Sequence, residues 1–295
     1  MTSATPNLRP TPRDILAALL PHLRVAAAYA RRIQSRIASH PDKGEADNFF
    51  ATALTDADLS VQTFVEVVLL GLFPDVRFHG EEYEKTYNTK YFRATTLGPD
   101  GDYLVTLDPI DGTRFYLDNH PNYQIILGVL NADDFEAVIA ITPAQDCYYY
   151  GLRGEGTFVG QLANDLEDCR PLQVDASTNA ILLGWNMGRY ASRLDRYQVV
   201  SVKTDYSKTT AIPNVNGLLS GTLSGAMLRS GKFIDGAALA FLAQQAGCIV
   251  TTLTGEPLAP LHTCEDYQRS GLIIAASEAI HADLLNAYAS ENPPK

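Results

Sequence analysis

The chain has 295 residues, enough for one large domain or two of moderate size. Hydrophobic residues make up 46% of it and charged residues 19%, a balance that is typical of globular proteins and excludes a disordered chain. The formal net charge of −11 argues against a nucleic-acid backbone or an anionic membrane as the main partner. A small phosphorylated molecule remains a possible ligand, because bound cations can bridge its charge to an acidic protein.

The start of the chain and its cysteines predict a soluble, cytoplasmic protein. Residues 1–10 are polar and lack the apolar core of a signal peptide, and no apolar run is long enough to cross a bilayer. The cysteines are widely spaced and form no Cys-x-x-Cys pair, so we expect buried thiols in a reducing compartment and no zinc site. They are Cys147, Cys169, Cys248 and Cys264.

Two helices are predicted in the first quarter of the chain. Residues 11–37 begin with a Thr-Pro cap and keep apolar residues at helical spacing, with a kink or a restart expected at Pro21. Residues 39–50 are predicted to form a loop. Thr55 then opens the second helix and places Asp58 in its first turn.

Strands dominate the part of the chain that follows. A short strand at 76–80 leads to Glu81 and Glu82, and a long excursion over 83–102 precedes a buried strand at 103–107. Three further strands are predicted as an antiparallel meander, at 123–130, 135–141 and 147–150. A polar stretch at 161–168 is typical of a linker.

The second half of the chain alternates helices and strands. Strands are predicted at 180–185, 248–253 and 271–276, and helices at 191–202, at 236–246 after Asp235, and from Ser277 to residue 289. This order predicts an α+β fold of stacked helix and sheet layers. We expect two halves, 11–165 with most of the acidic candidates and 166–295 with Asp235.

The sequence Asp-Pro-Ile-Asp-Gly-Thr at residues 108–113 is the strongest functional signal. It follows the buried strand at 103–107, so Asp108 and Asp111 emerge together at a strand end. A turn at Gly112 can aim both carboxylates and the Ile110 carbonyl into one space, and hard divalent cations prefer such oxygen ligands. A helix starting near Thr113 would turn its free amide groups toward a phosphate in the same space.

Other acids lie at the ends of predicted elements, and each has an ordinary structural explanation. Asp58 and Asp235 can simply stabilise helix starts, and the pair Glu81 and Glu82 can lie in a solvated turn. Converging on one cleft, however, these carboxylates would repel each other, and bound cations would remove that repulsion. Two or three Mg²⁺ ions would then form a phosphoryl-transfer site. Thr113 could polarise a metal-bound water, and Asp58 could accept its proton.

These motifs resemble the signatures of the inositol monophosphatase superfamily. The similarity rests on residues 108–113, on Gly-Glu-Glu at 80–82, and on Asp-Gly-Ala-Ala at 235–238 with Gln-Ala-Gly at 245–247. It covers the chain from about Thr55 to the last predicted helix. That superfamily contains magnesium-dependent, lithium-sensitive phosphatases of inositol phosphates, bisphosphorylated nucleotides and fructose 1,6-bisphosphate. The resemblance implies an α-β-α-β-α layered fold, commonly as a homodimer.

The resemblance also implies roles for particular residues. The first metal would be held by Glu81, Asp108 and the Ile110 carbonyl, and the second by Asp108, Asp111 and Asp235. Thr113 and Asp58 would orient the attacking water, with Glu82 just outside the first metal's ligands. The amides of Gly112 and Thr113 would bind the phosphate.

The substrate-binding segments depart from the family pattern. Arg114 stands where Thr or Lys is common, Ile234 replaces the usual Trp, and the residues that grip an inositol ring are not evident. The corresponding stretches, 208–216 and 227–232, are rather basic. We expect Arg114 to meet a second anionic substrate group, since guanidinium binds phosphate in a bidentate manner. For Arg229 and Lys232, pairing with surplus carboxylates or exposure to solvent is the simpler expectation.

The sequence therefore predicts a Mg²⁺-dependent phosphomonoesterase acting on an inositol or sugar monophosphate. The alternatives are a 3′(2′),5′-bisphosphate nucleotidase or sugar bisphosphatase, and a catalytically silent regulator that binds metal or phosphate on the same fold. An EF-hand calcium protein is disfavoured, because no Asp-rich loop with that spacing is present.

Overall fold

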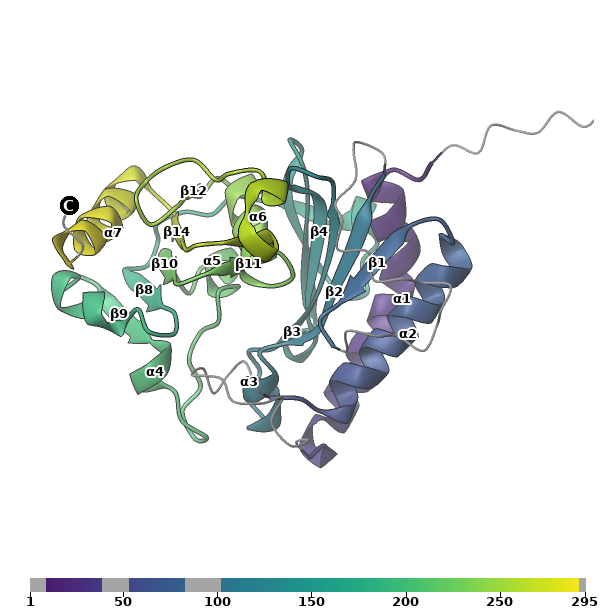
Figure 1. The fold of residues 1–295 in the computed structure, drawn as a ribbon. Helices are drawn as coiled ribbons and strands as arrows, with labels where there is room; N and C mark the ends of the chain where they lie inside the picture. Colours follow the sequence, from purple (N-terminus) through teal and green to yellow (C-terminus); the bar gives the residue numbers. More distant parts are fainter. Residues whose placement is uncertain (1–8, 39–52, 83–101, 292–295) are drawn as a thin grey trace, which may run out of the picture.

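The computed structural model describes residues 9–38, 53–82 and 102–291 (Figure 1). The loop predicted at 39–50 lies outside these ranges, as does nearly all of the excursion predicted at 83–102.

Two long helices, α1 (Pro12–Ile33) and α2 (Asp56–Leu72), lie side by side at one face of the molecule (Figure 1). Each begins with a capping box, in which a threonine and an aspartate three residues later exchange hydrogen bonds. The restart predicted at Pro21 is wrong, because α1 continues through this residue. Pro21 lies on the exposed face of α1, while the leucines of the opposite face are buried and hold the helix in place. A short 3₁₀ helix, Gln34–Arg36, follows.

A seven-stranded sheet packs against these helices. Its strands follow the chain order, with β1 parallel to β2 and all other neighbours antiparallel. They are β1 (Arg77–Gly80), β2 (Leu104–Asp111), β3 (Gln124–Leu130), β4 (Phe135–Thr142), β5 (Cys147–Leu152), β6 (Gly156–Gln161) and β7 (Arg170–Leu172). The predicted meander is confirmed. The sequence reasoning missed β6 and β7, whose glycine, proline and charged residues hide the alternation of a strand.

A second sheet has five strands in the order β12-β14-β10-β8-β9, and β11 pairs separately with β13. The bounds are β8 (Ala180–Leu183), β9 (Gln198–Ser201), β10 (Gly225–Leu228), β11 (Gly231–Lys232), β12 (Ile249–Thr251), β13 (Gln268–Arg269) and β14 (Leu272–Ala275). The helix predicted at 191–202 is wrong. A 3₁₀ helix, Gly188–Arg193, is followed by β9, whose two valines favour an extended chain that pairs with β8.

The remaining helices are α3 (Thr113–Leu117), α4 (Val202–Asp205), α5 (Gly217–Ser220), α6 (Gly236–Gln245) and α7 (Glu278–Glu291). Further 3₁₀ turns lie at Pro143–Gln145, Leu166–Asp168, Leu261–Thr263 and Glu265–Tyr267. The helices predicted after Asp235 and Ser277 are confirmed. The Ser277 hydroxyl accepts a hydrogen bond from the Ile280 amide, which caps α7.

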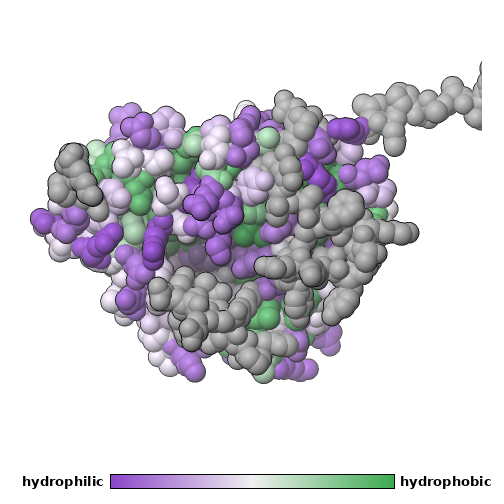
Figure 2. All heavy atoms as spheres, viewed as in Figure 1, coloured by the Kyte–Doolittle hydropathy of each residue, from purple (hydrophilic) through white to green (hydrophobic). Residues whose placement is uncertain are grey.

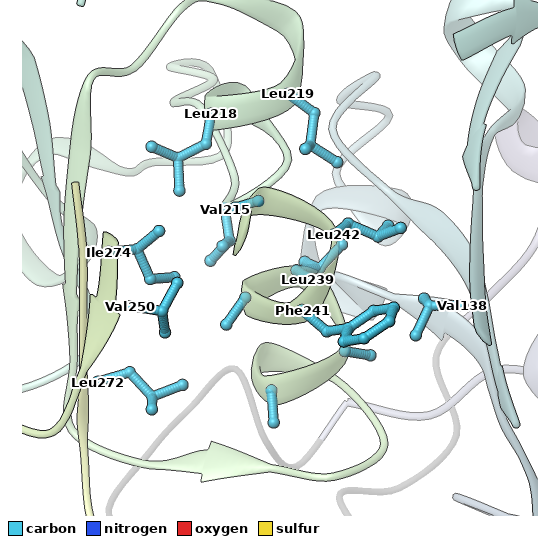
Figure 3. Packing of buried hydrophobic residues seen from close by; sticks show 14 of the residues in the cluster. Val138, Val215, Leu218, Leu219, Leu239, Phe241, Leu242, Val250, Leu272 and Ile274 are labelled. Atoms are coloured by element: carbon cyan, nitrogen blue, oxygen red, sulfur yellow. The ribbon is translucent and has the colours of Figure 1, made fainter. Parts of the chain in front are cut away.

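Three hydrophobic clusters lie between the layers and pack them together. One joins α1 and α2 to the large sheet, the second fills the space between the two sheets, and the third joins the small sheet to α7. Figure 3 shows the second cluster, where Phe241 and Leu242 of α6 point toward Val138 of β4 while Val250 and Ile274 approach from the small sheet. The expected α-β-α-β-α layering is thus confirmed.

Within the described residues, none of the helices combines the length and the apolar character that a membrane crossing requires. All four cysteines are free thiols, but only Cys248 is buried, so the expectation of buried thiols is wrong for the other three.

Candidate functional site

A cavity of about 290 Å³ lies where the end of β2 meets the start of α6. Its lining combines the acidic candidates with a wall from the small sheet, including Leu182, Trp185 and Leu228. The predicted site residues that line it are Glu81, Asp108, Ile110, Asp111, Gly112, Thr113 and Asp235. The face of the molecule in Figure 2 is largely hydrophilic, with hydrophobic atoms in smaller patches.

The end of β2 is shaped by a local irregularity. The pairing with β3 shifts register between Asp108 and Asp111, and this shift turns both carboxylates to the same cavity. The Ile110 amide donates to Asp108 Oδ1 at 3.1 Å, which fixes that carboxylate. Gly112 has φ of +83°, and a Cβ there would lie 2.9 Å from the Phe115 side chain, so the turn requires glycine.

Asp111 is held by two amide side chains from different parts of the fold. Gln124 Nε2 of β3 donates to its Oδ2 at 2.7 Å, and Asn214 Nδ2 donates to the same oxygen at 2.9 Å. The sequence reasoning missed both donors. Gln124 is the one polar residue of an otherwise apolar strand that is buried throughout, and this is a signal that could have identified it.

Asp58 serves the helix start and faces the site at once. Its Oδ2 accepts from the Thr55 amide at 2.8 Å and from the Thr55 hydroxyl at 2.5 Å, which completes the capping box of α2. Its Oδ1 lies 3.2 Å from the Thr113 hydroxyl. The same hydroxyl lies 2.9 Å from the Ile110 carbonyl oxygen, so its single proton can be donated to either acceptor.

Glu81 and Glu82 follow β1 and are positioned by a residue of α2. The Glu82 amide donates to Gln62 Oε1 at 2.8 Å, and Gln62 Nε2 donates back to the Glu82 carbonyl. A Cβ on Gly80 would lie 2.3 Å from the Gln62 side chain, so glycine is what allows this approach. Glu82 is only 3% exposed and is not among the described residues that line the cavity, whereas Glu81 is. Gln62 was also missed, although a glutamine beside the apolar stripe of a helix is a usable signal.

Burial and mutual repulsion disfavour the charged forms of these acids. Burial, with repulsion from Glu81, Asp111 and Asp235, raises the pKa of Asp108 well above its usual range. Burial raises the pKa of Asp111 to about 6, although its amide partners lower it in part. Burial and the charge of Asp111 raise the pKa of Asp235 to about 7, against the opposing effect of Lys232. The charged forms of these carboxyls are therefore unfavourable in the protein alone, and a bound cation would favour them.

These residues fit a divalent cation by donor type and by charge. Carboxylates and a carbonyl offer the hard oxygen ligands that Mg²⁺ prefers, and a cation would offset the repulsion that raises the pKa values. In the part of the chain that the structure describes, no three Asp, Glu, His or Cys side chains already form a group that could hold a metal ion.

The basic residues near the site differ in their placement. Arg114 is not among the described residues that line the cavity, and its carbonyl accepts from the Tyr206 hydroxyl at 3.3 Å. Lys232 lines the cavity and lies close enough to Asp235 to lower the pKa of that carboxyl.

The layered fold and the acidic cavity are features of a known protein family. Residues 17–293 match the inositol monophosphatase family, and the chain belongs to it. It is 28% identical over 254 residues to the probable inositol 1-monophosphatase ImpA of Mycobacterium tuberculosis, covering 82% of this chain and 83% of that protein. It is 26% identical over 279 residues to the putative Nus factor SuhB of Neisseria meningitidis, covering 90% of this chain and 97% of that protein. Among solved structures, an IMPase/NADP phosphatase complexed with Mg²⁺ and phosphate superposes with a TM-score of 0.66 at 18% identity, over 93% of this chain and 95% of that chain.

In the presence of a chelator, Asp108→Asn is expected to raise the melting temperature at pH 8 by a few °C, on the order of 1 kcal/mol of stability. The folded-state pKa of Asp108 lies above its unfolded value, so wild-type stability falls as pH rises through the folded pKa. The asparagine variant has no carboxyl group to ionise, so it does not lose stability in this way. Near pH 4 the difference in melting temperature between the variant and the wild type should shrink. Differential scanning fluorimetry at both pH values measures it.

Asp14→Asn is the matched control. Hydrogen bonds from Thr11 lower the pKa of Asp14, so removing the charge of this carboxylate should lower the melting temperature at pH 8. A wild type that is more stable than Asp108→Asn at pH 8 without divalent cations would contradict the proposed repulsion.

Proposed function

We propose that this protein is a Mg²⁺-dependent phosphomonoesterase that hydrolyses a small phosphorylated metabolite by attack of a metal-activated water. The observation that carries the proposal is the convergence of Glu81, Asp108, Asp111 and Asp235 on one cavity, beside Thr113 and its partner Asp58. Membership of the inositol monophosphatase family supports it, as does the name of the mycobacterial relative.

The ligand oxygens divide into two groups around Asp108. Glu81, Asp108 and the Ile110 carbonyl would hold one cation, and Asp108, Asp111 and Asp235 a second. When bound, such cations neutralise charge on the phosphate and lower the pKa of a coordinated water. Gln124 and Asn214 leave one oxygen of Asp111, Oδ1, outside their hydrogen bonds, so that oxygen is available as a ligand.

Thr113 and Asp58 form the path by which a proton leaves the attacking water. The Thr113 hydroxyl can accept a hydrogen bond from that water while it donates its own proton to Asp58 Oδ1. Asp58 is held by Thr55 through its other oxygen, so Oδ1 remains directed at the site. Glu82, which is buried, would lie just outside the ligands of the first cation.

The phosphate would be bound by the amides of Gly112 and Thr113, at the left-handed turn that begins α3. Arg114 follows directly, and its contact with a second anionic group of the substrate stays a prediction. An inositol or sugar monophosphate is the family's default substrate, with a bisphosphorylated nucleotide or sugar as the alternative. A homodimer is likewise expected from the family, and analytical ultracentrifugation measures it.

A catalytically silent regulator of the same fold is the alternative from another class. Such a regulator would bind metal or phosphate without turnover. Mg²⁺-dependent phosphate release that is abolished in the Asp108→Asn variant would therefore exclude this alternative.

Phosphate release is expected to require Mg²⁺, and Asp108→Asn should lower turnover by about a hundredfold or more. Asp108 is proposed to contact both cations, and several kcal/mol of transition-state stabilisation depend on them. Asp235→Asn should also be severe. Release of inorganic phosphate from a panel of small phosphate esters, with and without Mg²⁺, measures this.

Asp118→Asn is the control for the Asp108 variant. This acid lies at the end of α3, accepts from the Tyr206 hydroxyl and is not among the described residues that line the cavity. Its variant should keep turnover within about threefold of wild type, because it lacks a contact with the metals or the water. Near wild-type activity in Asp108→Asn would contradict the assignment of the site.

Asp58→Asn should lower turnover by about a hundredfold or more, because the amide cannot accept the proton. It should also lower stability by about 1 kcal/mol, since Asp58 belongs to the capping box of α2. Turnover and melting temperature are measured on the same preparations.

The chain contains its own control for this experiment. Asp14 occupies the equivalent position in the capping box of α1, away from the cavity, so Asp14→Asn reports the loss of the cap alone. Equal turnover in Asp58→Asn and Asp14→Asn would contradict the proposed catalytic role of Asp58 and would leave it only the role of a helix cap.

A further inference from the structure

A second cavity of about 500 Å³ adjoins the first and extends it away from the carboxylates. It is lined by Gly184, Trp185, Leu228, Arg229, Ser230, Gln268 and Ser270. Four of these residues, Gly184, Trp185, Leu228 and Ser230, also line the first cavity, so the two form one continuous cleft. We call the second cavity the outer cleft. A substrate whose phosphate lies at the carboxylates can therefore extend over Trp185 into it.

Cationic side chains gather around Trp185 in this cleft. Arg229 lines the outer cleft and Lys232 lines the first cavity, with Ser230 between them lining both. Lys203 lies with its Nζ 5.8 Å from the centre of the Trp185 ring. All three side chains are exposed, and within the described ranges none of them forms an ion pair.

Arg229 forms no ion pair within the described residues, in contrast to many other arginines of this acidic chain. Eight others form ion pairs with aspartate or glutamate: Arg13, Arg24, Arg31, Arg77, Arg153, Arg193, Arg196 and Arg269. The described lining of the outer cleft contains serine, glutamine and apolar residues besides Arg229, and no carboxylate. An anion there would meet a guanidinium and hydrogen-bond donors without a repelling charge in the wall.

Lys232 faces the same space from the side of the carboxylates. It lines the first cavity together with Trp185 and Ser230, which also line the outer cleft. Arg229 and Lys232 thus offer two positively charged side chains to a substrate group that lies beside Trp185.

We propose that the substrate carries a second phosphate group, which binds beside Trp185 between Arg229 and Lys232. This inference rests on the proposed phosphomonoesterase function and names its substrate class as a bisphosphorylated metabolite. The scissile phosphate lies at Gly112 and Thr113, the body of the leaving group crosses Trp185, and the second phosphate reaches the outer cleft. Specificity over a monophosphate then comes from the outer cleft, without a change in the chemistry at the carboxylates.

The test compares matched substrates that differ only in the second phosphate. The pairs are adenosine 2′,5′-bisphosphate with adenosine 2′-monophosphate, and fructose 1,6-bisphosphate with fructose 1-phosphate. Values of kcat/KM are measured with Mg²⁺ for the wild type, Arg229→Gln and Lys232→Gln. We expect a wild-type preference for the bisphosphate in at least one pair, and a drop of about tenfold in that preference in Arg229→Gln, which corresponds to one charged hydrogen bond.

Arg170→Gln is the matched control. Arg170 is an exposed arginine of β7 that forms no ion pair within the described residues and lines neither cavity, and its loss changes the net charge by the same amount. It should leave the preference at the wild-type value, which separates a local contact from a general effect of charge.

The outcomes separate the inference from the function on which it rests. Hydrolysis with no preference for the bisphosphate of either pair, or a preference that Arg229→Gln does not change, overturns the inference and leaves the phosphomonoesterase intact. No Mg²⁺-dependent phosphate release from any of the four compounds or from the wider ester panel overturns both. A loss of preference in Arg170→Gln as large as in Arg229→Gln also overturns the proposed contact.

Discussion

Repulsion among the carboxylates around Asp108 is the constraint on which the site depends. Burial and like charge raise the pKa values of Asp108, Asp111 and Asp235 together, so the charged forms of these groups are unfavourable in the protein without a cation. Such an arrangement is costly unless a cation completes it. A bound divalent cation would offset both the burial and the repulsion of these carboxylates.

The layers of the fold hold these groups in place against that repulsion. Asp58 and the Gln62 contacts come from α2, Asp108 and Asp111 from β2, and Asp235 from the start of α6, so the acids are held by three different packed elements. Two hydrophobic clusters, on either side of the large sheet, fix α2 and α6 relative to β2. Amide side chains then complete the arrangement, since they donate hydrogen bonds to a carboxylate without adding another charge.

Local signals explain what could be predicted from the sequence. The run before Asp108, the glycine of the turn and the two Thr-x-x-Asp capping boxes each act within a few residues, and the strand, the turn and both helices are present as expected. Gln62, Gln124 and Asn214 could not be assigned in the same way, because each acts on a residue 13 to 103 positions away. The helix expected at 191–202 failed for a related reason: β9 gains its stability from pairing with β8, which no local pattern reveals.

The two walls of the cleft have different origins, and this bears on what the protein recognises. The carboxylate wall comes from the large sheet and the start of α6, within the residues that match the inositol monophosphatase family. The opposite wall comes from loops at the edge of the small sheet, where Trp185 follows β8 and Arg229 follows β10. Loops at strand ends can change residue type without disturbing the hydrophobic layers beneath them. Residues of this second wall can therefore change while the carboxylate wall is kept, which is why the proposed substrate contacts of this chain lie with Arg229 and Lys232 beside Trp185.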